Sequence, residues 1–424
     1  LALEQGHQEK FLEHKKQIRN LQSVQQKDLR EQSSHETFAL ALGWAYPLGY
    51  RLIFGTFLTI FAQSAISPRR SLEDFGKQSL SSSENKQTRS KVCLMDTMRA
   101  GRMVEIGRME CEEIEIPSIG DGQVLIRSEM ASICGSDLHV VMMGAGVTHS
   151  FPCPHGYPGH EGIGEIVESK VPGLSEGEQV LTFPNPPVGE CFNEYQRVEA
   201  QYCVPLPDTD LPRSHLLMAQ QLGTVIYAMR KCQRDVAGET VVVMGQGSAG
   251  LFWTHLLKRA GAKKVIVSDI SPARLEVAAS YGADICIDIR NGNLHEAVKD
   301  STKGKGADYV VEAVGRAETF RESVDLVRAD GEIMWFGLPS VDHDIDMRFH
   351  KFFRKRLRAS SIYGAQDEPE AISFRMALDL ISKGHIDVES LLSHVFNIEE
   401  LGAAFVLAHD PHEDEALKVS IKFD

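Results

Sequence analysis

A glycine-rich turn between two apolar runs limits what this chain of 424 residues can fold into. Residues 240–250 read TVVVMGQGSAG, a run of β-formers that ends in a GxGxxG pattern. The residues after it have helical apolar spacing, and KVIVSD at 264–269 predicts a second strand. Strand, tight turn, helix and strand in this order are typical of a βαβ unit that binds the pyrophosphate of a dinucleotide.

Each residue of the pattern has a physical role. Gly245 allows the tight turn, Gly247 lets the backbone approach a pyrophosphate, and Gly250 lets the helix pack closely against the sheet. Ser248 and Ala249 begin the helix, whose first N–H groups are free to bind phosphate. We therefore assign all five to the cofactor site. The alternative, a glycine-rich turn without a ligand, is disfavoured by the flanking strands.

Three residues beyond the turn extend the predicted cofactor site. Asp269 ends the second strand at the spacing that dinucleotide-binding units have, where its carboxylate accepts hydrogen bonds from the adenosine ribose. It would repel a 2′-phosphate, so NAD is favoured over NADP, although Arg274 weakens this preference. The run EAVG at 312–315 closes a further strand near the expected nicotinamide end, so we assign Val314 to the cofactor as well.

Short β-rich runs continue to alternate with helical segments after this unit. The runs are ADICIDI at 283–289, ADYVVEAVG at 307–315 and GEIMWFGL at 331–338. Strands that alternate with helices form a parallel sheet with helices on both of its faces. The sequence therefore predicts an α/β fold with a doubly wound parallel sheet.

A second motif lies upstream, in ICGSDLH at 133–139 and PGHEGIG at 158–164. Cys134, His160 and Glu161 offer a thiolate, an imidazole and a carboxylate, which suit zinc. Each residue alone is more often structural, as a buried thiol or a hydrogen-bonded histidine. Ligands on separate loops are normal for a catalytic zinc, whereas structural sites use tight pairs of cysteines.

The neighbours of the cysteine favour the catalytic interpretation. Ser136 is placed to reach a metal-bound alcohol oxygen, and His139 to pass a proton to solvent. Asp137 is expected to accept the hydrogen bond that orients a metal-bound imidazole; its alternative role is that of a turn residue.

Together these motifs resemble the zinc-dependent medium-chain dehydrogenase/reductase family, which includes alcohol, polyol, threonine and glucose dehydrogenases. The resemblance covers roughly residues 95–424. It is carried by CGSDLH at 134–139, GHEGIGEIVE at 159–168, FNEYQRVEAQYCVPLPD at 192–208, VVVMGQGSAG at 241–250 and ALDLISKGHIDVESLLSHVFNIEELGAAF at 377–405.

The resemblance implies a domain arrangement. A β-rich GroES-like catalytic domain is expected over residues 94–221, completed by 360–424, and a Rossmann NAD-binding domain over 222–359. Such proteins are commonly dimers or tetramers, so a homo-oligomer is expected.

The resemblance also implies a metal site and a reaction. Cys134 and His160 are the expected zinc ligands, and Glu161 is a ligand in some members and a movable neighbour in others. Gln220 stands where the polyol branch has a ligating glutamate, so we place it on or near the metal. The reaction implied is hydride transfer between an alcohol, polyol or sugar hydroxyl and NAD, with Ser136, His139 and Glu161 as catalytic residues.

One departure from the family concerns its second metal. The lobe that normally holds a structural zinc is reduced here to residues 182–195, which contain only Cys191. We therefore expect one zinc per chain. Two rival functions stay open: a metal-free NAD(P)H-dependent reductase of the same superfamily, and a nucleotide-binding protein without catalysis.

Composition excludes other classes. A formal net charge of −14 disfavours a nucleic-acid partner, since binding phosphate requires an excess of lysine and arginine. The eight cysteines form no CxxC pair, which is typical of free thiols in a reducing, cytoplasmic compartment. A small-molecule substrate is the expected partner.

The first ninety residues differ from the rest. An apolar stretch at 37–66 is interrupted by Pro47 and carries Arg51 near its middle, which disfavours a membrane span. The Ser-rich segment 67–92 has the composition of a linker. We interpret residues 1–93 as an extension outside the fold, disordered or helical; a targeting or membrane segment is the alternative.

Overall fold

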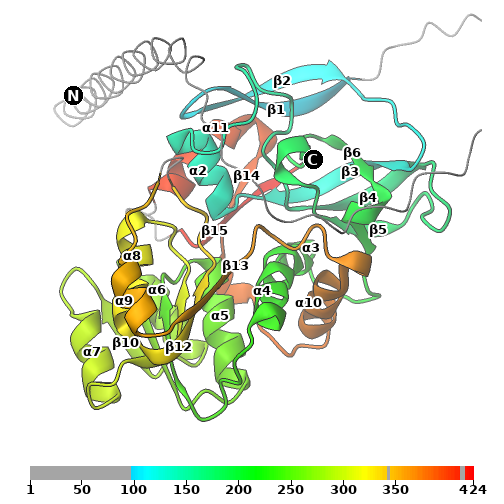
Figure 1. Cartoon of the computed structure of the whole chain (residues 1–424). Helices are drawn as coiled ribbons and strands as arrows, with labels where there is room; N and C mark the ends of the chain where they lie inside the picture. The colour runs from blue at the N-terminus through cyan, green and yellow to red at the C-terminus, as the bar shows by residue number, and fades with distance from the viewer. Residues whose placement is uncertain (1–96, 341–343, 411–415) are drawn as a thin grey trace, which may run out of the picture. The chain divides into compact units, whose positions relative to one another are not determined.

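The computed structural model describes residues 97–340, 344–410 and 416–424 (Figure 1). The expectations for residues 1–93, including the apolar stretch 37–66, lie outside the described residues. Within the described ranges, no helix has both the length and the apolar character needed to cross a bilayer.

A six-stranded parallel sheet forms the first half of the fold. Its strand order is β10-β9-β8-β11-β12-β13, and every neighbouring pair is parallel. The strands are β8 Thr240–Met244, β9 Lys264–Asp269, β10 Ile285–Asp288, β11 Ala307–Glu312, β12 Val327–Trp335 and β13 Arg358–Ser361. The predicted strands are confirmed, and β13 is added at the edge of the sheet.

Helices cover both faces of this sheet, as the alternating pattern predicts. Val241 and Val243 of β8 share one buried core with helix α5, whereas Val242 and Met244 share another with helices α7 and α8. Successive side chains of a strand point to opposite faces, so one apolar run supplies both cores. The helices of this half are α4 Ala219–Lys231, α5 Ser248–Arg259, α6 Pro272–Ser280, α7 Leu294–Ser301, α8 Ala317–Leu326, α9 Phe349–Arg354 and α10 Ile372–Ser382.

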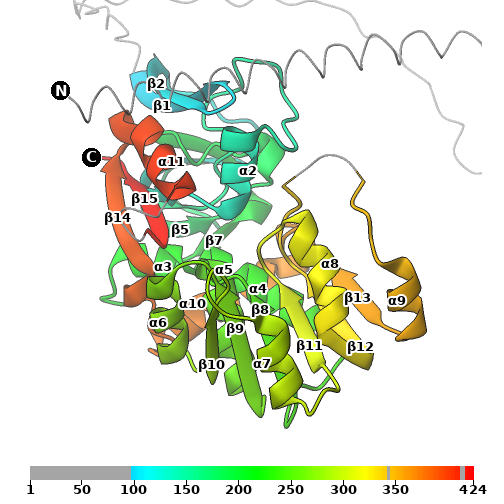
Figure 2. The ribbon, with the colours of Figure 1, turned by 90° about the vertical axis from the view of Figure 1, so that its left-hand side faces the viewer.

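The second half is a mainly antiparallel sheet with the strand order β14-β15-β3-β4-β5-β7, in which β6 also pairs with β3. Its strands are β3 Gln123–Ser132, β4 Gly162–Ser169, β5 Gln179–Thr182, β6 Tyr195–Glu199, β7 Cys203–Pro205, β14 Leu392–Asn397 and β15 Lys418–Lys422. Strands β14 and β15 lie side by side next to helix α11 (Leu401–His409), as Figure 2 shows. The end of the chain thus returns to a sheet begun almost three hundred residues earlier.

Shorter elements complete this half. A separate hairpin of β1 and β2 precedes it, and helix α2 follows β3. These elements are β1 Thr97–Glu105, β2 Arg108–Glu115, α2 Gly135–Met143 and α3 Arg213–Leu217. Single 3-10 turns are η1 Pro186–Val188, η2 Ala200–Tyr202, η3 Pro369–Ala371, η4 Glu389–Leu391 and η5 Ile398–Glu400.

The two sheets share one hydrophobic core. Buried residues of β3 and β4, such as Val124 and Ile163, belong to the same cluster as Val241 of the parallel sheet. Helices α4 and α10 pack together within this cluster, and Phe374 of α10 stacks on Phe183 with ring centroids 4.1 Å apart. The fold class expected from the sequence is confirmed. The expected boundary at 221/222 falls within α4, and the domain limits stay predictions.

Candidate active site

The structure brings together the thiol, imidazole and carboxylate that the sequence singled out. One ligand atom each from Cys134, His160 and Glu161 lies within 4.8 Å of the other two. His160 and Glu161 are buried, whereas Cys134 is partly accessible. A compact cluster with one accessible member suits a site that must admit a substrate.

Strand pairing explains why residues from two motifs meet. Strands β3 and β4 are antiparallel neighbours, with Ala131 opposite Gly162. Cys134 follows the end of β3, and Glu161 precedes the start of β4, so both lie at the same end of the strand pair. The backbone N–H of Ser132 donates to the carbonyl of Glu161 at 3.1 Å, which extends the pairing to the cluster.

Asp137 lies beside the imidazole, whose Nδ1 is hydrogen-bonded to the Pro158 carbonyl at 3.1 Å. Its Oδ1 lies 3.0 Å from Nδ1 of His160, and its Oδ2 accepts from the backbone N–H of Cys134 at 2.9 Å. Nε2 of His160 is left toward the cluster, with the Ser136 hydroxyl at 3.4 Å. Burial alone would lower the pKa of His160, but the charges of Asp137 and Cys134 outweigh burial and raise that pKa well above its usual value.

Glu161 has one occupied and one open carboxylate oxygen. Its Oε2 accepts from the Ser132 hydroxyl and from the ammonium of Lys418. Burial would raise the pKa of Glu161, but the Lys418 charge outweighs it and leaves the pKa lowered, so the side chain is ionised. The buried Oε1 has no hydrogen-bond partner among the described residues. A carboxylate oxygen without a partner, beside a thiol and an imidazole nitrogen, fits a divalent zinc ion.

Gln220 lies beside this cluster rather than within its closest group. It is buried in the first turn of α4, and its amide Nε2 donates to the backbone carbonyl of His160 at 3.3 Å. It thus steadies the loop that carries His160, and its role as a ligand stays a prediction.

Two residues at the cluster were missed from the sequence. Gln221 donates from Nε2 to Sγ of Cys134 at 3.8 Å. Lys418 is buried, pairs with Glu161, and donates to Oε1 of Gln221 at 3.3 Å. The one signal available was the pair of glutamines at a place where the resembled family has a charged ligand. Nothing in the sequence around Lys418 distinguishes it from an exposed lysine of a strand.

His139 lies on the same helix as Ser136, one turn further along. A side chain at Gly315 would come within 3.1 Å of the His139 ring, so this ring borders the turn after β11. Burial is the largest cause that lowers the pKa of His139, and the His409 charge adds to it. The imidazole is therefore neutral at pH 7 and able to accept a proton.

The glycine-rich turn has the geometry that its sequence predicts. Gly245 has φ +86°, which only glycine adopts readily, and a Cβ at Gly250 would stand 1.9 Å from the carbonyl oxygen of Gly245. A Cβ at Gly247 would meet no atom within 4 Å, so space is left in front of this residue. Ser248 and Ala249 form the first turn of α5.

The residues expected to select the cofactor occupy distinct positions. The carboxylate of Asp269 accepts from the backbone N–H groups of Gln246 at 2.6 Å and Ser271 at 2.9 Å, which fixes it beside the turn. Arg274 donates to the carbonyl of Ala416 at 2.9 Å, so its guanidinium is engaged with the C-terminal segment. Val314 packs against the turn, since a Cβ at Gly245 would stand 2.7 Å from its Cγ2.

A buried carboxyl holds the turn that presents Val314. Oε1 of Glu312 accepts from the backbone N–H groups of Val314 and Gly315, each at 2.9 Å, and from the Thr319 hydroxyl. Its Oε2 is buried without a partner among the described residues. Burial is the largest cause that shifts the pKa of Glu312, and despite these hydrogen bonds the pKa is raised.

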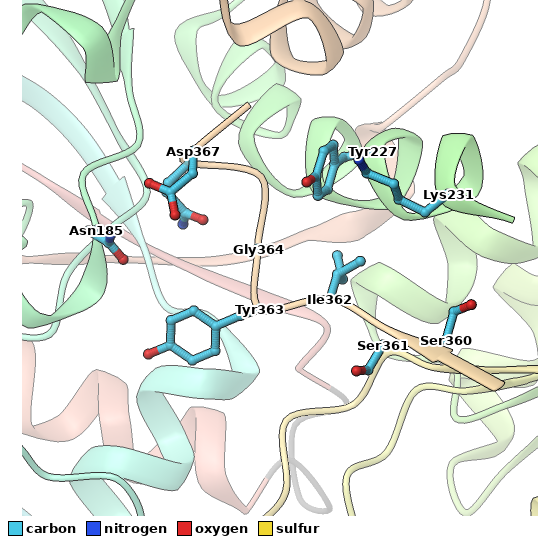
Figure 3. Close-up of a pocket in the computed structure, with 10 residues that line it drawn as sticks. Asn185, Tyr227, Lys231, Ser360, Ser361, Ile362, Tyr363, Gly364 and Asp367 are labelled. Atoms are coloured by element: carbon cyan, nitrogen blue, oxygen red, sulfur yellow. The ribbon is translucent and has the colours of Figure 1, made fainter. Parts of the chain in front are cut away.

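A pocket of about 480 Å³ opens along helix α4 (Figure 3). Tyr227 and Lys231 line it from α4, whose first turn carries Gln220 and Gln221. Asn185 contributes from the connection between β5 and β6. The other lining residues come from β13 and the segment after it.

Two family models match the chain and together span just over half of it. Residues 120–208 match the alcohol dehydrogenase GroES-like domain, and residues 249–377 match the zinc-binding dehydrogenase model. The chain belongs to the zinc-dependent medium-chain dehydrogenase/reductase family. It is therefore an oxidoreductase of a family that works with zinc and a nicotinamide cofactor.

Individual members of this family are similar along most of their length. The L-threonine 3-dehydrogenase of Rhizobium rhizogenes is 28% identical in an alignment of 322 positions that covers 69% of this chain and 90% of that protein. An alcohol dehydrogenase of Cupriavidus necator is 27% identical over 77% of this chain and 98% of its own. The structure of the alcohol dehydrogenase TADH from Thermus sp. ATN1 superposes with a TM-score of 0.65 at 26% identity, over 77% and 99% of the two chains.

The second and third glycines of the turn, Gly247 and Gly250, should separate the effect of binding from that of packing. We expect Gly250→Ala to lower the free energy of unfolding by about 1–3 kcal/mol, because the added methyl collides with backbone. Gly247→Ala should leave stability unchanged and weaken NAD binding by about tenfold or more, because its methyl occupies the approach of the pyrophosphate. Denaturant unfolding and NAD titration measure both effects; equal stability losses in the two variants would contradict this assignment.

Glu312 should make stability depend on pH. Because the pKa of Glu312 is raised in the folded protein, its stabilising contribution is present below the unfolded value of 4.5 and is lost as pH rises through the folded value. Glu312→Gln removes the titration and keeps the acceptor oxygen. We therefore expect the free energy of unfolding of Glu312→Gln, minus that of the parent, to increase from pH 4.5 to pH 8. Denaturant unfolding of both proteins measures this difference.

The matched variant Glu312→Ala leaves backbone N–H groups unpaired. We expect it to be destabilised by about 1–3 kcal/mol across the same pH range. A Glu312→Gln curve parallel to that of the parent would show that this carboxyl does not titrate as described.

Proposed function

We propose that this protein is a zinc-dependent dehydrogenase that transfers a hydride from an alcohol, polyol or sugar hydroxyl to NAD. One observation carries the proposal: the thiol–imidazole–carboxylate cluster is connected through Gln221 to Ser248, the first residue of the helix after the glycine-rich turn. This connection supports metal chemistry and dinucleotide binding at adjoining positions, as hydride transfer between substrate and cofactor requires.

The ligand set follows from the donor atoms. Cys134, His160 and Glu161 would hold the zinc, with Gln220 beside it, and the accessible side of Cys134 leaves room for a substrate oxygen. When bound, the zinc supplies Lewis-acid polarisation that lowers the pKa of the substrate hydroxyl, and the nicotinamide accepts the hydride.

The side chains of Ser136 and His139 transfer the proton in this proposal. The Pro158 carbonyl and the Asp137 carboxylate both lie on the Nδ1 side of the His160 ring, which leaves Nε2 for the site. Ser136, with its hydroxyl 3.4 Å from that nitrogen, is positioned to accept the proton from the substrate hydroxyl. His139 follows one helical turn later on the same face and is the next side chain proposed to receive the proton.

The preference for NAD rests on Asp269. Its carboxylate is held at the turn by two backbone N–H groups, where it favours ribose hydroxyls over a 2′-phosphate. Arg274, the residue that would soften this preference, donates to the Ala416 carbonyl. The structural neighbours include a Sinorhizobium meliloti zinc-binding dehydrogenase bound to NADP, at 23% identity and a TM-score of 0.66, so the cofactor must be tested directly.

The number of zinc ions, the cellular location and the oligomeric state are also part of the proposal. We propose one zinc per chain, since the reduced lobe offers only Cys191, which is buried against Thr182 and Gln196. A reducing, cytoplasmic location fits the free state of the cysteines in the described part of the chain. A homo-oligomer stays part of the proposal on the basis of the family.

A substrate panel with measured zinc content tests this function. We expect zinc near one per chain and NADH formation with at least one class of alcohol, polyol or sugar. Cys134→Ala should lower turnover by at least about a hundredfold while NAD binding is kept, because a first ligand is lost. Cys203→Ala, a buried thiol outside the cluster, is the matched control and should keep both zinc and turnover.

The rival functions give different results in the same experiment. Absence of zinc with NADPH-dependent reduction would favour the metal-free reductase. NAD binding without turnover across the panel would favour a protein that has lost catalysis.

A further inference from the structure

A single glutamine side chain joins the metal cluster to the dinucleotide turn. Nε2 of Gln221 donates to Sγ of Cys134 at 3.8 Å. Its Oε1 accepts from the hydroxyl of Ser248 and from Nζ of Lys418, the latter at 3.3 Å. Gln221, Ser248 and Lys418 are all buried. Only two contacts therefore separate the sulfur from the first residue of helix α5.

Chemistry fixes which way this amide points. An ammonium group has only N–H donors, so the atom of Gln221 that faces Lys418 must be the acceptor oxygen. The nitrogen is then left toward Cys134, whose thiolate only accepts. A flipped amide would place its NH₂ group against the Lys418 ammonium and its oxygen against the thiolate, which loses both interactions.

The ammonium of Lys418 contacts both Glu161 and Gln221. It pairs with Oε2 of Glu161, a member of the metal cluster, and also binds the oxygen of Gln221. The salt bridge with Glu161 holds this ammonium against the amide oxygen. The amide is therefore polarised at its oxygen, which strengthens the N–H donor that faces the sulfur.

We infer that Gln221 is a positioning residue that couples the donor strength of the Cys134 thiolate to occupancy of the dinucleotide turn. The inference rests on the proposed function, because it takes Cys134 as a metal ligand and the turn as the cofactor site. An N–H bond to a thiolate withdraws charge from the sulfur and leaves a bound metal more electrophilic. A phosphate at the start of α5 changes the hydrogen bonding of Ser248, and Gln221 transmits that change to the sulfur.

Substitution of cobalt for zinc allows this coupling to be measured by absorption spectroscopy. The test uses the full-length protein with Co²⁺ in place of zinc and follows the thiolate-to-cobalt charge-transfer band before and after addition of NAD. In the parent protein we expect the band to move when NAD binds. Loss of the N–H bond raises the energy of the sulfur electrons, so the band should lie at longer wavelength in variants that lack it.

Two substitutions separate the two ends of the amide. Gln221→Met removes the contacts at both ends of the amide at similar volume. The band should therefore move to longer wavelength, and its response to NAD should disappear. KM for NAD should rise about three- to tenfold, the value of one hydrogen bond. Gln221→Glu keeps an acceptor for Ser248 and Lys418 but has no N–H donor. It should show the same displaced band with a KM for NAD closer to that of the parent.

Gln196→Met is the matched control. Gln196 is a buried glutamine whose Oε1 accepts from the Cys191 thiol at 3.3 Å, outside the metal cluster. Its replacement should lower the melting temperature without moving the charge-transfer band. A purely structural role of Gln221 would give the same result as this control.

The outcomes distinguish this inference from the proposed function. If Gln221→Met and Gln221→Glu bind cobalt with an unchanged band and an unchanged response to NAD, the inference is wrong while the metal site stands. If the parent protein shows no thiolate band, or Cys134→Ala retains it, the metal site itself is wrong. Should Gln221→Met fail to fold, the displaced band of Gln221→Glu alone decides the inference.

Discussion

The pairing of strand β3 with its neighbours is the constraint on which the site depends. One edge of β3 pairs with β4, and the other pairs first with β6 and then, through Met130 to Ser132, with β15. Cys134 follows β3, Glu161 precedes β4, and Lys418 begins β15. Backbone hydrogen bonds of three strands therefore set the positions of a thiol, an acid and a lysine that have no local relation in the sequence.

Charge balance explains why these groups tolerate burial together. Glu161 and Lys418 are both almost wholly buried, and an isolated charge there would be costly. The opposite charge of each residue lowers the free-energy cost of burying the other. Ser132 donates a further hydrogen bond to Glu161, and Gln221 accepts one from Lys418. The Glu161 oxygen without a partner and the nearby sulfur fit a divalent ion as a further partner of the cluster.

The sequence predicted the parts of this site that local chemistry encodes. The glycine turn could be recognised because each glycine answers a steric need, and Cys134, Asp137 and His160 because their side chains suit zinc and its orientation. Lys418 was missed because it meets Glu161 across 257 residues, and a strand lysine carries no mark of burial. Gln221 was missed for a related reason: its importance comes from packing between α4, α2 and α5, which no spacing along the chain reveals.

The hydrophobic core that both sheets share has a consequence for how ligands enter and leave. Phe183 and Phe374 stack across it, and Gly223 allows α4 to approach α10 at the same place, since a side chain there would come within 2.4 Å of Phe374. Separating such closely packed side chains would expose apolar surface and lose their contacts. Exchange of the coenzyme is therefore expected to proceed without separation of the two halves.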